Sequence, residues 1–296
     1  MKTIVPLVSA LLISGCSMPS AGAGNEMRAE TSGVLHAGAQ NSRKSRPENG
    51  RHGGRSEQRS RHTDASRCDA IHAGGTEPKV VDARLSRLTA SLCFRAFAVL
   101  HSGVSRTPIY VSELLTRASV DEARILITRD NRFHPEPRLA VTERSELADY
   151  RGSGYDRGHM APSGDMGDPD DDFDSFSLAN IVPQDAQLNR HGWAELEGYV
   201  RDLAESLGTV YVVTGPAFLG TDLDRLHGRV LVPSHVWKAA YVPGQGAGAW
   251  IVTNDEKQQW ETISIADLTT RVGIDPFPTL DRASKTRVPA FPTFER

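Results

Sequence analysis

The chain divides near Cys68 into a part that cannot form a hydrophobic core and a part that can. Residues 17–67 are rich in Ser, Gly, Arg and His and contain few large apolar side chains, so they cannot bury enough apolar surface to fold alone. The 229 residues of 68–296 are enough for one domain with its own core. The sequence therefore predicts a single folded domain over 68–296, preceded by a disordered basic tether over 16–67.

The N-terminus has the pattern of an export signal. The apolar stretch from Ile4 to Ile13 is too short to span a bilayer, and it ends at Ile13-Ser14-Gly15-Cys16, which resembles the lipobox of bacterial lipoproteins. It predicts a signal peptide over 1–15, and a lipidated Cys16 that anchors an exported protein in the cell envelope. Ser17 favours the outer membrane where the source has two membranes. An ordinary signal peptide, cut near Ala21 or Ala23, is the alternative.

With Cys16 assigned to lipid, Cys68 and Cys93 remain. A pair of cysteines in an exported protein predicts a disulfide, here closing a loop of about 25 residues. Neither cysteine has a His-rich or C-x-x-C neighbourhood, which argues against zinc and against thiol catalysis.

The predicted elements of the folded part belong to the α+β class. Short apolar, β-branched runs predict strands at Phe94–Leu100, Ile109–Val111, Val210–Thr214, Val236–Val242 and Ala249–Val252. An apolar stripe without proline predicts a long helix over Gln187–Leu207, and Ser264 is a candidate N-cap for a second helix that ends at Arg271. Strands on both sides of a long helix predict a mixed β-sheet core with packed helices.

Three polar features have an ordinary and a functional interpretation. Lys238 lies in a predicted strand, where a lysine at the sheet edge is favoured over a phosphate ligand. The acidic run from Asp168 to Asp174 is interpreted as a solvated loop, because it lacks the glycine and terminal glutamate of a calcium loop. His191 is expected to be solvated or to face nucleic acid.

The most informative motifs lie in the middle of the chain. They are Tyr155-Asp156-Arg157-Gly158-His159-Met160-Ala161-Pro162, then Asn180-Ile181-Val182-Pro183-Gln184, then Leu188-Asn189. Hydrolysis of a phosphodiester needs a base for water and positive charge for the phosphate. His159 titrates near neutral pH, Arg157 can grip phosphate oxygens, and Asn189 offers a carbonyl oxygen of the kind that Mg²⁺ prefers.

In their fixed order these motifs resemble the DNA/RNA non-specific endonuclease family, over roughly residues 68–290. The resemblance implies a ββα-metal (His-Me) finger active site, with His159 as general base and Asn189 as the protein ligand of Mg²⁺, for which Mn²⁺ is a possible substitute. It further implies that Arg157 belongs to the catalytic motif. The remaining implied site residues are Asn180, which supports the site, Glu197, which holds metal-bound water, and the arginines Arg201 and Arg106, of which Arg106 binds phosphate.

Helix geometry tests one of these assignments. In a continuous helix, Glu197 would lie about 80° round from Asn189 and about 12 Å along the axis. This separation disfavours direct binding of one ion by both residues and allows a water-mediated role of Glu197. A surface ion pair between Glu197 and Arg201 is the ordinary alternative.

The charge distribution keeps a second function open. Residues 17–67 carry nine Lys and Arg against five Asp and Glu, a net charge of +4, whereas residues 68–296 carry 24 against 32, a net charge of −8. Because proteins that bind nucleic acid normally present positive charge, an envelope-anchored nucleic-acid-binding protein without catalysis is the alternative function. In that case the basic tether would capture nucleic acid. The other interpretation is that the tether is only a spacer. A phosphodiesterase for small molecules is a third possibility and would need a closed pocket.

Overall fold

The computed structural model describes residues 68–125, 131–287, 291–292 and 294. The predicted signal peptide over 1–15, the lipidated Cys16 and the tether up to residue 67 lie outside these residues and remain predictions. Within the described part of the chain, the helices are all too short or too polar to cross a membrane.

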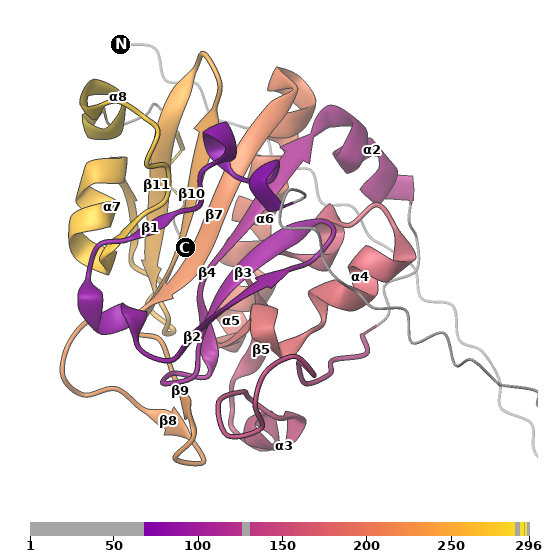
Figure 1. The fold of residues 1–296 in the computed structure, drawn as a ribbon, viewed down its shortest axis with the longest axis vertical. Helices are drawn as coiled ribbons and strands as arrows, with labels where there is room; N and C mark the ends of the chain where they lie inside the picture. The colour runs from indigo at the N-terminus through magenta and orange to yellow at the C-terminus, as the bar shows by residue number, and fades with distance from the viewer. Residues whose placement is uncertain (1–67, 126–130, 288–290, 293, 295–296) are drawn as a thin grey trace, which may run out of the picture. The chain divides into compact units, whose positions relative to one another are not determined.

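A seven-stranded sheet forms the centre of the fold (Figure 1). Its spatial order is β12-β11-β10-β7-β4-β3-β2, and every neighbouring pair is antiparallel. The strands are β2 (Thr89–Cys93), β3 (Phe97–Ser102), β4 (Thr107–Thr116), β7 (Thr209–Ala217), β10 (His235–Val242), β11 (Gly246–Thr253) and β12 (Trp260–Ile263). The α+β class is confirmed, but the predicted mixed sheet is wrong, because all neighbouring strands are antiparallel. Hairpins join β2 to β3, β3 to β4, β10 to β11 and β11 to β12, whereas longer segments connect β4 to β7 and β7 to β10.

Alternating side chains of the strands build two cores. On β7 and β10, Val212 and Val236 belong to one core, while Val213 and Trp237 belong to the other. This alternation is the period of two that an extended strand imposes. Because both faces of the sheet are covered, the central strands are continuous apolar runs in the sequence.

Helices cover the two faces separately (Figure 1). The first face carries α2 (Arg117–Ile125) and α6 (Gly192–Leu207), and α6 buries Trp193, Leu196 and Val200. The opposite face carries α7 (Ile265–Val272) and α8 (Arg282–Thr286). The short pair β1 (Lys79–Val80) and β13 (Ile274–Asp275) joins the start of the domain to its end.

The predicted helix after Ser264 is confirmed. The Ser264 hydroxyl oxygen accepts a hydrogen bond from the backbone N–H of Asp267 at 3.1 Å, and Gly273 ends α7 in the left-handed conformation. The first two predicted strands are also present, as β3 and β4, and they pair as a hairpin. Phe94 lies outside it, however, because the backbone N–H of Phe94 bonds to the carbonyl of Phe97 at 2.9 Å and closes a turn.

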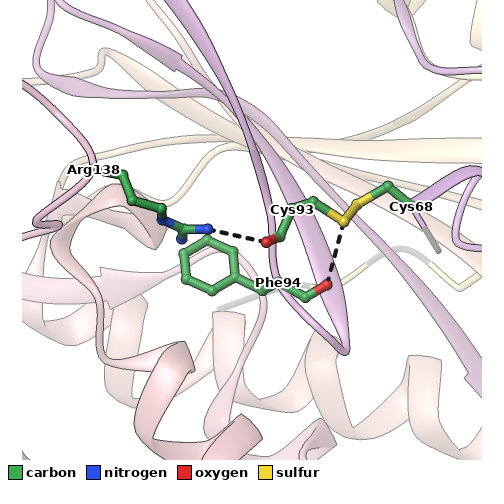
Figure 2. The surroundings of a disulfide bond; sticks show 4 residues. All are labelled: Cys68, Cys93, Phe94 and Arg138. Atoms are coloured by element: carbon green, nitrogen blue, oxygen red, sulfur yellow. Dashed lines mark hydrogen bonds between the residues drawn. A yellow bond between two sulfur atoms is a disulfide. The ribbon is translucent and has the colours of Figure 1, made fainter. Parts of the chain in front are cut away.

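The predicted disulfide is present between Cys68 and Cys93 (Figure 2). It ties the first described residue to the end of β2, with 5.9 Å between the two Cα atoms. The carbonyl of Cys93 also accepts a hydrogen bond from Arg138 Nη1 at 3.0 Å, and the same guanidinium lies over the Phe94 ring at 4.2 Å. The bridge therefore belongs to a cross-linked corner of the domain.

Replacing both cysteines, as Cys68→Ala/Cys93→Ala, is expected to reduce the free energy of unfolding by about 2–4 kcal/mol, because the unfolded chain regains the freedom of the closed loop. Thermal unfolding should show Tm lower by roughly 10 °C. Treating the wild type with a reductant should give the same shift, and an unchanged Tm in the variant would mean that the bridge does not constrain the domain.

Candidate active site

A small ββα unit lies against the first face of the sheet and carries the predicted motifs. It consists of β5 (Asp156–His159), β6 (Ile181–Gln184) and α5 (Ala186–Arg190). The two strands pair antiparallel, with His159 opposite Ile181 and Gly158 opposite Val182. Position 158 requires glycine, because a β-carbon there would collide with the buried side chain of Gln184.

The turn from β6 to α5 is fixed by capping and by the sheet. The Asp185 carboxylate caps α5 by accepting hydrogen bonds from the N–H groups of Gln187 and Leu188 at 2.9 and 3.0 Å. Buried Asn254, just after β11, accepts from Asp185 N at 2.8 Å and donates to the Pro183 carbonyl at 3.0 Å. The unit is thereby bonded directly to the end of a sheet strand.

The long helix predicted over Gln187–Leu207 is interrupted at His191. This residue has φ −123° and ψ −90°, ends α5 and begins α6. Gly192 follows it where a β-carbon would approach the Trp260 ring to 3.1 Å, so a larger residue has little room. Asn189 and Glu197 therefore belong to different helices, and the geometry expected from one continuous helix does not apply. His191 itself is exposed, as predicted.

Asn189 is oriented by Asp156, which lies in the predicted motif just before Arg157. The amide nitrogen of Asn189 donates to Asp156 Oδ2 at 3.0 Å, and Arg190 makes two further bonds of 2.8 Å to the same carboxylate. Burial would raise the pKa of Asp156, but the hydrogen bonds from Arg190 and Asn189 and the nearby arginine charges lower it. The carboxylate stays ionised and holds the amide with its carbonyl oxygen directed away from Asp156.

This arrangement fits the predicted metal. A carbonyl oxygen on a fixed amide is a suitable ligand for a hard cation that keeps most of its water shell. Among the residues that the structure describes, His, Cys, Asp and Glu side chains do not gather in threes as a metal site. The assignment of the metal therefore rests on Asn189 and stays a prediction.

His159 is held in an aromatic enclosure. Its side chain is buried, and its ring lies 4.9 Å from Phe176, edge to face, and 5.4 Å from Phe133. Arg157 is exposed, and its guanidinium carbon lies 4.0 Å from the centre of the Phe133 ring, one of the two aromatic rings around His159. Phe133 therefore contacts both the predicted base and the predicted phosphate ligand, and keeps them at one place.

Asn180 has a supporting position. It is fully buried, and its amide nitrogen donates to the carbonyls of Ala161 and Ser175 at 2.8 and 2.9 Å, while its oxygen accepts from Ala161 N at 2.9 Å. These bonds fix the backbone directly after His159 and close to Phe176. The geometry agrees with the supporting role that the family resemblance implies.

Arg201 and Glu197 lie on α6, next to a group of buried charged side chains, and not in the ββα unit. Arg201 donates to the buried Asp165 carboxylate at 2.7 Å. Glu197 is half-buried and acts electrostatically on Arg201 and on buried Glu113 of β4. The roles predicted for Arg201 and Glu197 remain predictions.

Lys238 contradicts the prediction of a sheet-edge lysine. It lies on the central strand β10, and its side chain is 1% exposed. The ammonium donates to Thr214 Oγ1 at 2.8 Å and to the carbonyl of Met160 at 3.3 Å, and lies 3.6 Å from Glu113 Oε1. Sequence alone could not reveal this, because Glu113 is far away in the chain. Through its bond to the Met160 carbonyl, Lys238 thus holds the backbone of the residue that follows His159.

The acidic run also differs from the prediction. Pro169–Ser175 form helix α4, with Asp168 as N-cap accepting from Asp170 N at 2.9 Å. An Asp cap, proline in the first turn and acidic residues near the positive end of the helix dipole all favour this helix. Phe176 follows α4 and contacts His159, so the acidic helix borders the site. Arg95 pairs with Asp168 and Asp171 and offsets part of this charge.

Arg106 lies in another group of side chains. It occupies the turn between β3 and β4, and the nearest charged groups acting on it are Arg229, Asp149 and Arg225. A cavity of about 680 Å³ opens on the opposite face of the sheet, next to α7, and none of the seven predicted site residues lines it. It does not supply the closed pocket that a small-molecule diesterase would need at this site.

Comparison with known proteins assigns the chain to a family. Residues 81–283 match the profile of the DNA/RNA non-specific endonuclease family. The chain belongs to this family. The matched region includes all seven predicted site residues, and membership confirms both the resemblance and the predicted enzyme class, a hydrolase of nucleic acids.

Several relatives of the family are similar over part of their length. Nuclease C1 of Cunninghamella echinulata var. echinulata is 38% identical over 175 residues, which are 54% of this chain and 69% of that protein. Mitochondrial nuclease EXOG of Homo sapiens is 31% identical over 224 residues, 67% of this chain and 60% of that protein. A chain in the crystal structure of the EndoG/EndoGI complex has a TM-score of 0.60 and 25% identity, covering 66% of this chain and 88% of that chain.

Three supporting residues escaped the sequence-based prediction. Asp156 was visible as the first residue of the motif, but nothing in the sequence shows that it binds the amide of Asn189. Phe133 and Asn254 carry no local signal, because each acts through contacts with residues distant in the chain.

Proposed function

We propose that this family member is a Mg²⁺-dependent endonuclease that hydrolyses phosphodiester bonds of DNA and RNA with little sequence preference. The observation that carries the proposal is the placement of His159 on β5 and Asn189 on α5 in one ββα unit, joined by the Asp156–Asn189 hydrogen bond of 3.0 Å. A histidine base beside a fixed amide oxygen suits phosphodiester hydrolysis with one hard cation.

The side chains divide the reaction between them. His159 takes a proton from water as the water oxygen bonds to phosphorus and the bond to the 3′ oxygen breaks. Arg157 offsets the added negative charge on the phosphate, with its guanidinium braced on Phe133. Mg²⁺ held by Asn189, or Mn²⁺ in its place, would supply positive charge for the leaving oxygen. Asp156 and Asn180 keep these groups in place without contacting the substrate.

We further propose that the enzyme acts outside the cytoplasm, held to the envelope through lipid on Cys16. The sequence Ile13-Ser14-Gly15-Cys16 supports this placement, and so does the Cys68–Cys93 disulfide, since such bonds persist in oxidising compartments. Metabolic labelling with a radioactive fatty acid should mark the wild type and leave Cys16→Ala unlabelled. Equal labelling of both proteins would contradict the anchor.

The activity is tested by incubating the purified full chain with supercoiled plasmid and with total RNA, in Mg²⁺ and in EDTA. The proposal predicts nicked and then fragmented plasmid, degraded RNA, and neither product in EDTA. An intact plasmid and intact RNA in Mg²⁺, with nucleic acid retained by the protein, would instead favour the binding protein without catalysis.

A further inference from the structure

We infer that Arg225 and Arg229, together with Arg106, for which the family resemblance already implies phosphate binding, form a second anion site that binds a backbone phosphate next to the one being cleaved. This inference rests on the proposed nuclease function, and it names which side of the site the nucleic-acid strand occupies. The three arginines come from the β3–β4 turn and from the hairpin of β8 (Arg225–Leu226) and β9 (Val230–Leu231).

The first observation is the backbone of Arg106. Its φ of +61° lies in the left-handed region, where glycine or asparagine is the favoured residue of a hairpin turn. A residue with a β-carbon at such a position costs conformational energy that glycine would avoid. The turn itself is closed by backbone, through a hydrogen bond of 2.8 Å from Arg106 N to the Ser102 carbonyl. The arginine side chain is therefore not needed to form the turn.

The second observation is the surroundings of that side chain. Arg106 Nη1 is buried and has no hydrogen-bond partner among the described residues. Burial and then the positive charge of Arg229 lower the pKa of the guanidinium; the negative charge of Asp149 opposes this shift, and Arg225 adds to it. Like charges gathered around an unbonded donor are stabilised when an anion binds between them.

The third observation is that the hairpin is held firmly in this position. Leu231 N donates to the Ser105 carbonyl at 3.0 Å, next to Arg106. Arg229 Nε donates to Asp149 Oδ1 at 2.7 Å, and Arg225 Nη1 donates to the Arg229 carbonyl at 3.1 Å. Asp149 pairs with Arg229 and also acts on Arg106, but its single negative charge is set against three arginines, so the group keeps an excess of positive charge.

The hairpin is also joined to the active site. Leu226 and Val230 share a buried cluster with Ile181 of β6, which pairs with His159, and Phe133 packs against the same cluster. The charges of Asp149 and Arg157 both act on the buried hydroxyl of Tyr150, so Tyr150 is close enough to both groups to feel their charges. Helix α3 (Leu147–Tyr150) and β8 accordingly lie together at the lower end of the view in Figure 1.

The opposite flank of the site carries the acidic helix α4, which lies away from β8 in Figure 1. A polyanion is repelled there and attracted by the three arginines. The strand that carries the scissile phosphate therefore continues from Arg157 toward the β8–β9 hairpin.

Binding of a fluorescent single-stranded oligonucleotide to the full chain in EDTA, over a range of KCl concentrations, tests the inference without catalysis. Arg225→Gln and Arg106→Gly should each weaken binding about fivefold and lower the slope of log Kd against log salt by about one. Arg271→Gln, which removes a charge from α7 on the other face, should bind like the wild type. Arg106→Gly should keep the wild-type Tm, because glycine suits the turn.

Two outcomes would overturn the inference. One is wild-type affinity and salt slope in both variants, or an equal loss in Arg271→Gln. The other is an equal loss of kcat/KM by Arg225→Gln on the oligonucleotide and on bis(p-nitrophenyl) phosphate, which has a single phosphate; a neighbouring-phosphate site predicts that Arg225→Gln loses activity on the oligonucleotide alone. A wild type that binds the oligonucleotide but cuts nothing in Mg²⁺ would refute the proposed function and leave the binding result standing.

Discussion

His159→Ala is expected to lower kcat for DNA cleavage by about a thousandfold, because the attacking water loses its proton acceptor. The substitution removes the aromatic contacts of the ring with Phe133 and Phe176. The fold should survive, because Asn180 holds the neighbouring backbone independently of the ring. Circular dichroism and thermal unfolding establish that the variant is folded, and plasmid cleavage measures the loss.

His191→Ala is the matched control. It removes an imidazole two residues from Asn189, but this side chain is exposed and outside the ββα enclosure. It should keep cleavage within a few-fold of the wild type. Comparable losses in the two variants would show that His159 has no special role.

Lys238→Met is expected to have the largest effect on stability, reducing the free energy of unfolding by about 3–5 kcal/mol. The apolar replacement leaves Glu113 buried without its cation, near the Asp165 carboxylate. Burial already raises the pKa of Glu113, with Asp165 adding to the rise, so the loss of Lys238 removes a charge that opposes this shift. Chemical denaturation of both proteins at one pH gives the difference directly.

The double variant Lys238→Met/Glu113→Gln separates the charge effect from packing. Removing both charges should be less destabilising than removing Lys238 alone, because no unpaired carboxylate remains. If the double variant is instead destabilised by the sum of the two single changes, Lys238 and Glu113 do not interact.

The sequence could place the predicted site residues in one unit because they lie close together in the chain. Asp156, Arg157 and His159 follow one another on β5, and Asn189 follows β6 within one short helix. The strands were predictable in part, since both faces of the sheet are buried and the apolar runs are continuous. Strand direction was not, because an apolar run of this kind has the same pattern in a parallel and in an antiparallel sheet.

The parts that sequence could not supply depend on distant contacts. His191 and Gly192 interrupt the predicted helix because the chain must approach Trp260 at that point. Lys238 is buried because Glu113, Thr214 and the Met160 carbonyl receive it. Helix α4 is different, because Asp168 as N-cap and Pro169 in the first turn are helix signals in the sequence. The prediction of a solvated loop gave more weight to the acidic composition.

The charge of the domain also has a structural explanation. A net charge of −8 over residues 68–296 argues against broad contact with nucleic acid. Acidic residues gather on α4, whereas Arg106, Arg225 and Arg229 gather beyond Tyr150. A small basic region beside the site reconciles an acidic domain with a polyanionic substrate.

The central claim is that a histidine and a cation at Asn189 act on one phosphodiester, and the Mg²⁺ dependence of plasmid cleavage tests it most directly. The rate should be measured over a wide range of Mg²⁺ for the wild type and for Asn189→Ala. The wild type should saturate, while Asn189→Ala should need at least about tenfold more Mg²⁺ and reach a lower maximum. Superimposable curves for the two proteins would contradict the assignment of Asn189 as the metal ligand.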